Sequence, residues 1–339
     1  MASIKDVAEL AGVSKATVSR VLNNTGQIKD ATRARVNMAM EKLNYRPSPL
    51  AKSLATSSSN TVGLIVTSYR GSFFSELMAE VQEMMDSQEK FLLVGRGKRS
   101  RQSEQEAILK LMDMCCDGLI LHTRNMYDED LLDLAQKSTP FVILDREVKG
   151  LENRSVVYEH AEAGRLAVEH LIANGHRKIA CLAGPRSRMT AELRYAGYVQ
   201  ALQDHGIEVD EGLVAEADYD RVGGREAMAE IYQRHPDVTA VYSCSEEMCV
   251  GAFDFFREHN ISVPDDISIV SFDSVSICTM LTPQVTTVHF PIKEMAVEAA
   301  QVLVSLMSGE QDIQPKRFAP ELRLRDSVRR LSVSNNNAV

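Results

Sequence analysis

Short apolar runs rich in Val, Ile and Leu recur along most of the chain, separated by amphipathic stretches of helical length. Buried strands of parallel sheets covered by helices on both faces show this pattern. The runs are VGLIVT (62–67), FLLVG (91–95), GLILH (118–122), FVILD (141–145), KIACLAG (178–184), TAVYSC (239–244) and ISIVSF (267–272). Because so many strand–helix units exceed one sheet, the sequence predicts an α/β body of two parallel, doubly wound lobes with a cleft between them. The break near residues 155–160 is the expected crossover.

The first 45 residues follow a helical period instead. Ser3 and Asp6 fit a capping box that opens a first helix, and Gly12 ends it. Ser14 can cap a second helix after a turn of only two residues. A third helix is expected near residues 31–44, where the apolar positions Val36, Ala39, Met40 and Leu43 recur at helical spacing. The pattern predicts a small all-α helix-turn-helix unit.

In such a unit the second helix enters the DNA major groove with its N-terminal side chains at the base edges. Lys and Arg can donate to guanine, Ala can touch a thymine methyl group, and hydroxyls suit phosphates or bases. The candidate DNA contacts are Ser14, Lys15, Ala16, Thr17, Ser19 and Arg20. The alternative is that Lys15 and Arg20 are ordinary solvent-exposed helix residues.

Charge separates the two parts of the chain. The net charge is −9 overall, but residues 1–60 carry nine Lys or Arg against four Asp or Glu. The first 60 residues are therefore at +5 and the rest at −14. A basic head on an acidic body indicates that the head meets a polyanion, although a basic face exposed only to solvent would give the same count.

Between head and body, Pro47 and Pro49 interrupt the chain before the short segment Leu50–Ala55. A helix this short is marginal in isolation, so we expect it to form only when packed against a partner copy and DNA. Leu54 is a candidate wedge between base steps. Residues 56–61 are typical of a flexible linker, and a passive linker throughout is the alternative.

The segments IKDVAELAGVSKATVSRVLN and NYRPSPLAKSLA (44–55) resemble the head and hinge of the lactose/galactose repressor (LacI/GalR) family. Body segments FFSELM, GLENRS and VGGREAM are similar to galactose and β-glucoside regulators of that family. The resemblance implies a dimeric repressor in which Lys15, Ala16 and Arg20 read bases and Leu54 is the hinge leucine. It also implies a periplasmic-binding-protein-like body whose chain crosses between lobes near residues 160, 290 and 322.

The expected domain division follows from these patterns. Residues 1–46 form the DNA-binding domain and residues 47–60 the hinge helix and linker. Residues 61–330 form the effector-binding and dimerisation domain, and the resemblance implies an N-lobe at about 61–159 and 291–321 and a C-lobe at about 160–290 and 322–330. The tail 331–339 has no heptad, so we expect a homodimer and a palindromic double-stranded operator.

Ligands of parallel α/β sheets lie at the carboxyl ends of the strands. Five candidates follow strands directly: His122, Asp145, Ser245, Glu246 and Asp273. The resemblance adds Phe73, Phe74, Arg194 and Tyr219. Carboxylates and Arg can bond sugar hydroxyls and aromatic faces can cover a pyranose. In the alternative interpretation Asp145 and Asp273 are caps, and Phe74 and Tyr219 are core.

Two departures from the family pattern concern the ligand. Many members carry Asn-Asp where this chain has Ser245-Glu246, and a second Asp where it has Ser274. Because Glu246 is one methylene longer than Asp, it can shrink or reorient that side of the pocket. Recognition of galactose therefore does not transfer directly to this chain.

Other functions lack their motifs. The sequence has no GxxxxGK[ST], HExxH or GxSxG motif, so we expect no enzyme, cofactor or metal site. Six cysteines without CxxC spacing predict reduced, mostly buried thiols, and the chain has no bilayer-spanning run or signal-peptide pattern. We expect a cytoplasmic regulator, a repressor of a sugar-utilisation operon controlled by a small carbohydrate.

Three alternatives stay open. A nucleoside or purine could replace the carbohydrate within the same family. An architectural DNA binder with a vestigial pocket would need no effector. A sugar-processing enzyme carrying a DNA-binding head would turn over any sugar that binds.

Overall fold

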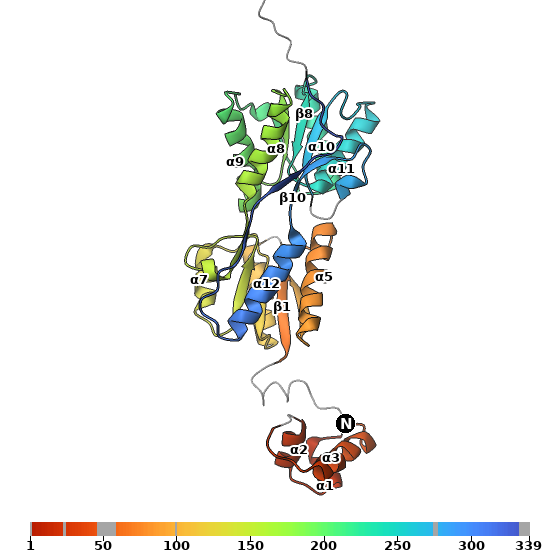
Figure 1. The fold of residues 1–339 in the computed structure, drawn as a ribbon, viewed down its shortest axis with the longest axis vertical. Coiled ribbons are helices and arrows are strands. Elements are labelled where there is room, and N and C mark those ends of the chain that lie inside the picture. The colour runs from red at the N-terminus through yellow and green to blue at the C-terminus, as the bar shows by residue number, and fades with distance from the viewer. Residues whose placement is uncertain (1, 23–24, 46–58, 99, 274–276, 332–339) are drawn as a thin grey trace, which may run out of the picture.

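The computed structural model describes residues 2–22, 25–45, 59–98, 100–273 and 277–331, and Leu54 of the expected hinge lies outside these ranges. Its first part is the small helical head at the lower end of Figure 1. The head contains α1 (Ile4–Ala11), α2 (Lys15–Leu22) and α3 (Asp30–Lys42). The helix-turn-helix prediction is confirmed.

Local sequence explains the ends of these helices. The Ser3 backbone N–H donates to the Asp6 carboxylate at 2.7 Å, and the Ser3 hydroxyl accepts from the Asp6 N–H, which completes the capping box. Gly12 ends α1 in the left-handed region at φ 62°, which a glycine adopts without strain. Seven buried apolar residues hold the three helices together: Val7, Ala8, Ala11, Val18, Val21, Val36 and Ala39.

The body begins with a six-stranded sheet in the order β11-β5-β4-β3-β1-β2, whose pairs are all parallel. Its strands are β1 (Thr61–Val66), β2 (Phe91–Arg96), β3 (Gly118–Leu121), β4 (Phe141–Leu144), β5 (Ser155–Tyr158) and β11 (Arg317–Phe318). The helices of this unit are α5 (Ser72–Ser87), α6 (Arg101–Asp113), α7 (Asp128–Ala135) and α12 (Ile292–Met307), with the 3₁₀ turn η1 (Glu152–Arg154). We call this unit the N-lobe (Figure 1).

The second sheet repeats this winding in the order β12-β10-β9-β8-β6-β7, and only its β12–β10 pair is antiparallel. Its strands are β6 (Ile179–Ala183), β7 (Val214–Glu216), β8 (Ala240–Ser243), β9 (Ser268–Asp273), β10 (Thr286–His289) and β12 (Glu321–Arg323). Its helices are α8 (His160–Ala173), α9 (Met189–Asp204), α10 (Arg221–Arg234) and α11 (Glu246–Glu258), with the 3₁₀ turns η2 (Glu211–Leu213) and η3 (Ile277–Thr279). This unit is the C-lobe.

The chain passes between the lobes three times. It leaves the N-lobe after β5, returns before α12, and leaves again between β11 and β12. One apolar cluster continues through this junction, and a second fills the other side of the N-lobe sheet. The three crossovers lie beside one another in Figure 1, so the lobes can change their mutual angle only by bending these strands.

The predicted fold class is confirmed, and the structure adds five strands that the sequence reading omitted. Each predicted apolar run contains one strand, β1, β2, β3, β4, β6, β8 or β9. The omitted strands β5, β7, β10, β11 and β12 have only two to four residues each. At two or three residues, β7, β11 and β12 give too few alternations to stand out. Residues 155–158, expected as part of a break, form strand β5, and the crossover follows it.

Two further observations concern the class of protein. Among the residues that the structure describes, no helix is both long and apolar enough to cross a bilayer. The six cysteines are free thiols; five are buried and Cys115 is exposed.

Candidate functional site

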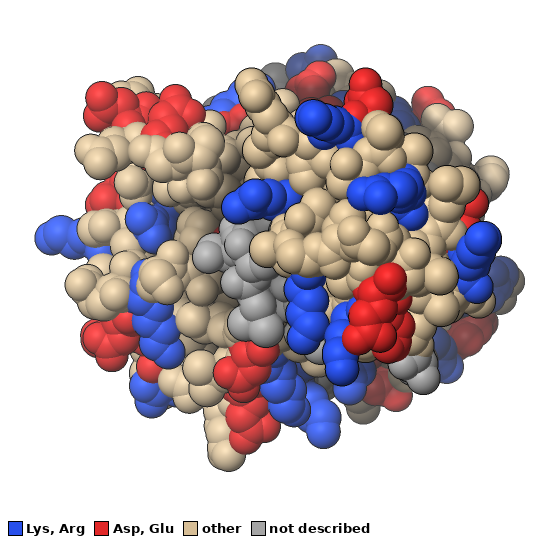
Figure 2. Space-filling view, turned by 90° about the horizontal axis from the view of Figure 1, so that it is seen from below, with Lys and Arg blue, Asp and Glu red and all other residues tan. Residues whose placement is uncertain are grey.

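The DNA-facing candidates lie on α2 and at its start. Lys15, Ala16 and Arg20 are exposed, whereas Thr17 and Ser19 are half-buried. On the opposite side of the helix, Val18 and Val21 are buried in the head core. Helix α2 is therefore anchored by its apolar side and presents Lys15, Ala16 and Arg20 to solvent. Lys and Arg side chains are spread over the end of the molecule shown in Figure 2, with Asp and Glu among them.

Ser14, a predicted DNA contact, also caps the start of α2. Its hydroxyl accepts from the Thr17 backbone N–H at 3.1 Å and lies 2.9 Å from the Thr17 hydroxyl. This N-cap fixes the direction in which α2 leaves the turn.

The candidate ligand site is built around the carboxylate of Asp145, which follows β4 at the junction of the lobes and is 2% exposed. One carboxylate oxygen accepts from Arg124 Nη2 at 2.6 Å, and the other lies 2.7 Å from His160 Nε2. Burial would raise the pKa of Asp145, but the hydrogen bond from His160 and the positive charge of Arg124 outweigh it and hold the pKa well below its usual range.

Hydrogen bonds extend from this carboxylate in both directions. Arg124 Nη2 also lies 2.6 Å from His122 Nε2, and Arg194 Nε donates to His160 Nδ1 at 3.1 Å. Since a guanidinium only donates, His122 accepts at Nε2 and His160 accepts at Nδ1. Both rings are then neutral, and His160 donates through Nε2 to Asp145. The resulting chain runs His122–Arg124–Asp145–His160–Arg194 and joins the N-lobe to α9 of the C-lobe.

Burial agrees with these protonation states. His122 and His160 are 1% and 3% exposed. Burial lowers the pKa of His122 to about 3, with the charge of Arg124 acting in the same direction. The pKa of His160 is also lowered, chiefly by burial. The N–H at His122 Nδ1 is buried and has no hydrogen-bond partner among the described residues, so it is a donor available to a ligand.

Close helix packing sets His160 beside Arg194. His160 begins α8, and Arg194 lies in the second turn of α9. A Cβ on Gly164 would meet the Arg194 carbonyl oxygen at 2.4 Å, and one on Gly197 would meet the Ala161 carbonyl oxygen at 2.1 Å. Only glycine permits this approach. Arg194 Nη1 also donates to the Cys244 carbonyl, and its guanidinium lies 3.9 Å from the ring centre of Phe272.

Aromatic side chains lie against this polar chain. Phe73 and Phe74, near the start of α5, have ring centres 5.3 and 5.6 Å from that of His122. Phe290 lies 5.6 Å from Phe73 and stacks on His160 at 5.7 Å. Phe73 and Phe74 are half-buried, so they are packed at the junction without being fully enclosed.

The C-lobe candidates have different surroundings. Ser245 caps α11, because its hydroxyl accepts from the Met248 N–H at 3.2 Å. Glu246 is 6% exposed and accepts at 2.7 Å from the hydroxyl of Ser72 in the N-lobe. Asp273 is 3% exposed and lies 4.0 Å from Arg325 Nη2.

Tyr219 also lies close to Arg194. The guanidinium of Arg194 is 5.9 Å from its ring centre, and Gly184 leaves room for the ring, since a Cβ there would come within 2.1 Å of it. Its hydroxyl is buried without a hydrogen-bond partner among the described residues. Burial raises the pKa of Tyr219 to about 12. A buried hydroxyl without a partner is costly unless a ligand or water meets it.

Four residues of this site were not predicted from the sequence. His160 and Phe290 follow crossover strands that were themselves overlooked. Arg124 lies three residues beyond the end of β3, past the residue that directly follows the strand. Glu104 is farther away in the sequence, on α6, and is fully buried.

Glu104 fixes the loop that carries Arg124. Its carboxylate accepts from the backbone N–H groups of Arg124, Asn125 and Met126 at 3.1, 2.9 and 3.1 Å, and from the Asn125 side chain at 2.8 Å. A Cβ on Gly97 would lie 2.4 Å from the Glu104 side chain, so a glycine is required there. A buried acid on a helix that faces a strand end is the sequence signal for this role.

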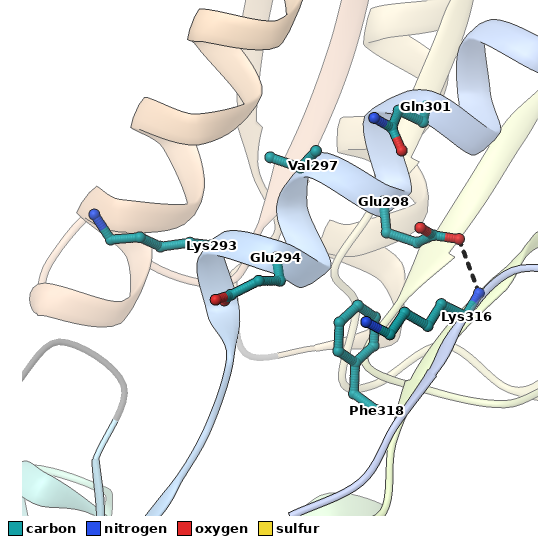
Figure 3. Close-up of a pocket in the computed structure, with 7 residues that line it drawn as sticks. All are labelled: Lys293, Glu294, Val297, Glu298, Gln301, Lys316 and Phe318. Atoms are coloured by element: carbon teal, nitrogen blue, oxygen red, sulfur yellow. Dashed lines mark hydrogen bonds between the residues drawn. The ribbon is translucent and has the colours of Figure 1, made fainter.

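Two surface depressions lie away from the lobe junction. The one in Figure 3 has a volume of about 270 Å³ and lies between α12 and β11, where the Lys316 N–H donates to Glu298 at 2.8 Å. Its lining is Lys293, Glu294, Val297, Glu298, Gln301, Lys316 and Phe318. The second is lined by residues near η1 and by residues 313–317. Neither contains any of the predicted ligand residues.

The head and the two-lobed body together define a bacterial DNA-binding regulator with a periplasmic-binding-protein-like body. Residues 3–48 match the model of bacterial regulatory proteins of the lacI family, and residues 168–328 match the periplasmic binding protein-like domain. The chain is 37% identical to the transcriptional regulator GalR of Escherichia coli over 97% of this chain and 96% of GalR. The chain belongs to the LacI family of transcriptional regulators.

Other similar proteins are also regulators of this kind. The regulator AscG of Escherichia coli is 34% identical over 97% of this chain and 98% of its own, and the repressor PurR of Vibrio atlanticus is 31% identical over 98% and 100%. The crystal structure of the lac repressor dimer bound to operator and the anti-inducer ONPF superposes with a TM-score of 0.86. It is 28% identical and covers 97% of this chain and 99% of that one. The predicted family is confirmed.

The neutral histidines predict acid sensitivity. An unfolded histidine titrates near pH 6.5, whereas His122 stays neutral in the folded protein down to about pH 3. The unfolded chain therefore binds more protons below pH 6.5, so His122 contributes stability above that pH and loses it as the pH falls. The loss is about 1.4 kcal/mol per pH unit. In urea unfolding at pH 7.5 and 5.0, we expect His122→Asn to reduce the drop in unfolding free energy by about 2 kcal/mol. An unchanged drop would contradict the buried neutral state of His122.

Proposed function

We propose that this regulator represses a sugar-utilisation operon and that a small carbohydrate, bound between the lobes, controls its affinity for the operator. The observation that carries the proposal is the hydrogen-bonded chain around Asp145, which joins the two lobes beside exposed parts of aromatic rings. A ligand that changes this junction changes the angle between the lobes. The spacing of two hinges, and with it operator affinity, then changes.

The proposed ligand contacts are the nine residues that the sequence indicated. They are Phe73, Phe74, His122, Asp145, Arg194, Tyr219, Ser245, Glu246 and Asp273. Two of them supply buried groups that have no hydrogen-bond partner within the described part of the chain, namely the His122 Nδ1–H and the Tyr219 hydroxyl. Phe73 and Phe74 supply ring faces of the kind that cover the apolar side of a pyranose. Arg124, which links His122 to Asp145, joins this set.

The charges at the junction favour an uncharged ligand. The carboxylate of Asp145 is paired with Arg124, and Asp273 lies beside Arg325. A buried ion is costly unless it is paired, and these ions already have partners. A polyhydroxy compound can add hydrogen bonds here without adding a charge. This supports a carbohydrate, while the similarity to PurR keeps a nucleoside or purine as the second candidate.

In the head, we propose that Lys15, Ala16 and Arg20 contact base edges, with Ser14, Thr17 and Ser19 at phosphates or bases. The exposure of the first three supports this assignment. Residues 1–46 would be the DNA-binding domain and residues 47–60 the hinge, with Leu54 in the minor groove. A regulator of this kind acts where its operator lies, so we place it in the cytoplasm.

We further propose a homodimer on a palindromic operator. Strand β2 is an edge strand, and on it Phe91 is 72% and Leu93 36% exposed. On the neighbouring helix α6, Leu109 is 45% and Met114, its C-cap residue, 59% exposed. An unpaired edge strand with exposed apolar side chains needs a cover, and a second copy would provide it. Lac repressor, of the same family, forms an operator-bound dimer in its crystal structure.

Operator binding tests the role of the head. We expect Arg20→Ala to weaken binding to the specific operator by about ten- to a hundredfold, as loss of a base contact does. Arg234→Ala, which removes a surface arginine of α10, is the matched control. Equal operator affinities for the two variants, measured by fluorescence anisotropy at fixed salt, would exclude Arg20 as a base reader.

Ligand binding tests the junction. A thermal-shift screen with mono- and disaccharides, β-glucosides and nucleosides identifies the ligand class, because a ligand of the folded state raises the melting temperature. We expect Tyr219→Phe to leave the melting temperature of the free protein unchanged or higher, since it removes a buried hydroxyl that no described residue bonds. The shift caused by the ligand should fall. A full shift in this variant would show that Tyr219 is not a contact; a nucleoside hit would select the second candidate.

The dimer has its own test. We expect Phe91→Glu to place a charge in the covered patch and convert the dimer to monomer in sedimentation velocity, with the circular dichroism spectrum unchanged. Tyr127→Glu, at an exposed apolar residue before α7, should stay dimeric. A dimeric Phe91→Glu variant would place the interface elsewhere.

A further inference from the structure

A side-chain hydrogen bond connects the first residues of two helices across the lobe junction. Ser72 is the first residue of α5 in the N-lobe, and Glu246 is the first residue of α11 in the C-lobe. The Ser72 hydroxyl donates to Glu246 Oε1 at 2.7 Å, although the two residues are 174 positions apart in the chain. The bond exists only when the two lobes are close together.

The surroundings of Glu246 make this bond strong. The residue is 6% exposed, so water competes little for its carboxylate. It lies in the first turn of α11, and its partner begins α5, where Gly71 occupies the N-cap position without a side-chain cap. The N-terminus of a helix attracts negative charge, and Glu246 lies in the first turn of α11 and bonds the first residue of α5. A hydrogen bond to a charged group is about twice as strong as a neutral one.

We propose that Ser72 and Glu246 form an inter-lobe latch that holds the two lobes closed before any ligand binds. Both residues act as positioning residues, because the latch fixes how Phe73, next to Ser72, meets His122 and Phe290. The length of the acid matters to this bond, because one methylene fewer, as in Asp, would draw the carboxylate back toward α11.

The latch affects both ligand binding and regulation. A ligand that binds the closed arrangement gains affinity in proportion to the fraction of the protein that is already closed. It must also enter through a junction that opens only when the latch breaks. The chain through Asp145, His160 and Arg194 persists when the latch is removed, so the variants below should stay folded while the lobes open more often.

Hydrogen–deuterium exchange of the full chain, without ligand, tests the latch. We expect Ser72→Ala and Glu246→Asp each to speed exchange at the starts of α5 and α11 by about tenfold, the factor set by loss of a hydrogen bond to a buried charge. Ser72→Thr keeps the hydroxyl and should restore protection. Ser75→Ala is the matched control, because among the described residues the Ser75 hydroxyl bonds to the Gly71 and Ser72 carbonyls of the same segment and not across the junction.

The exchange rate of the double variant shows whether Ser72 and Glu246 act through one shared bond or through two separate local effects. If Ser72 and Glu246 act through one bond, Ser72→Ala combined with Glu246→Asp exchanges no faster than either single variant. Independent effects would multiply, and that result would overturn the proposal. The proposal would also be overturned if Ser72→Ala exchanged at the same rate as Ser75→Ala. Since no ligand is present, these results do not depend on whether the effector is a carbohydrate.

Discussion

The structure depends most on one buried carboxylate. Asp145 ends a strand of the N-lobe, where water cannot stabilise its charge, and it is held between Arg124 and His160. His160 in turn accepts from Arg194, so the charge of one residue orients side chains of both lobes. Removing one partner of a buried pair leaves an uncompensated charge, which is more costly than the pair itself is worth. The lobes are thus coupled electrostatically where a ligand would bind.

The path of the chain lets a change at Asp145 affect the position of a whole lobe. Three strand connections cross between the lobes, and each lobe is a rigid doubly wound sheet. A change at the junction therefore moves the lobes as bodies. The latch between Ser72 and Glu246 adds a contact that favours one arrangement, and the Asp145 chain sets the geometry within it. In a dimer, the two N-lobes carry the two heads, so lobe rotation changes the spacing of the helices that face DNA.

Much of the architecture could be predicted from the sequence, because its signals are local. Ser3, Gly12 and Ser14 mark helix ends through their own backbone contacts, and long apolar runs mark the central strands. Strands β7, β11 and β12 could not be predicted because they have only two or three residues, and β5 was missed because its residues were expected to form the break between the lobes. Several side chains that surround Asp145 were also not indicated by the sequence. His160 follows an overlooked strand, Glu104 acts from a distant helix, and the bond of Glu246 to Ser72 is visible only once the lobes are folded together.

The reciprocity of operator and ligand binding tests the central claim most directly. Once the effector is identified, operator affinity is measured with and without saturating effector, and effector affinity with and without saturating operator. If the lobe junction couples the two sites, both ratios have the same value and differ clearly from one. Two ratios equal to one would show that the junction binds its ligand without controlling the head, which would contradict a ligand-responsive regulator.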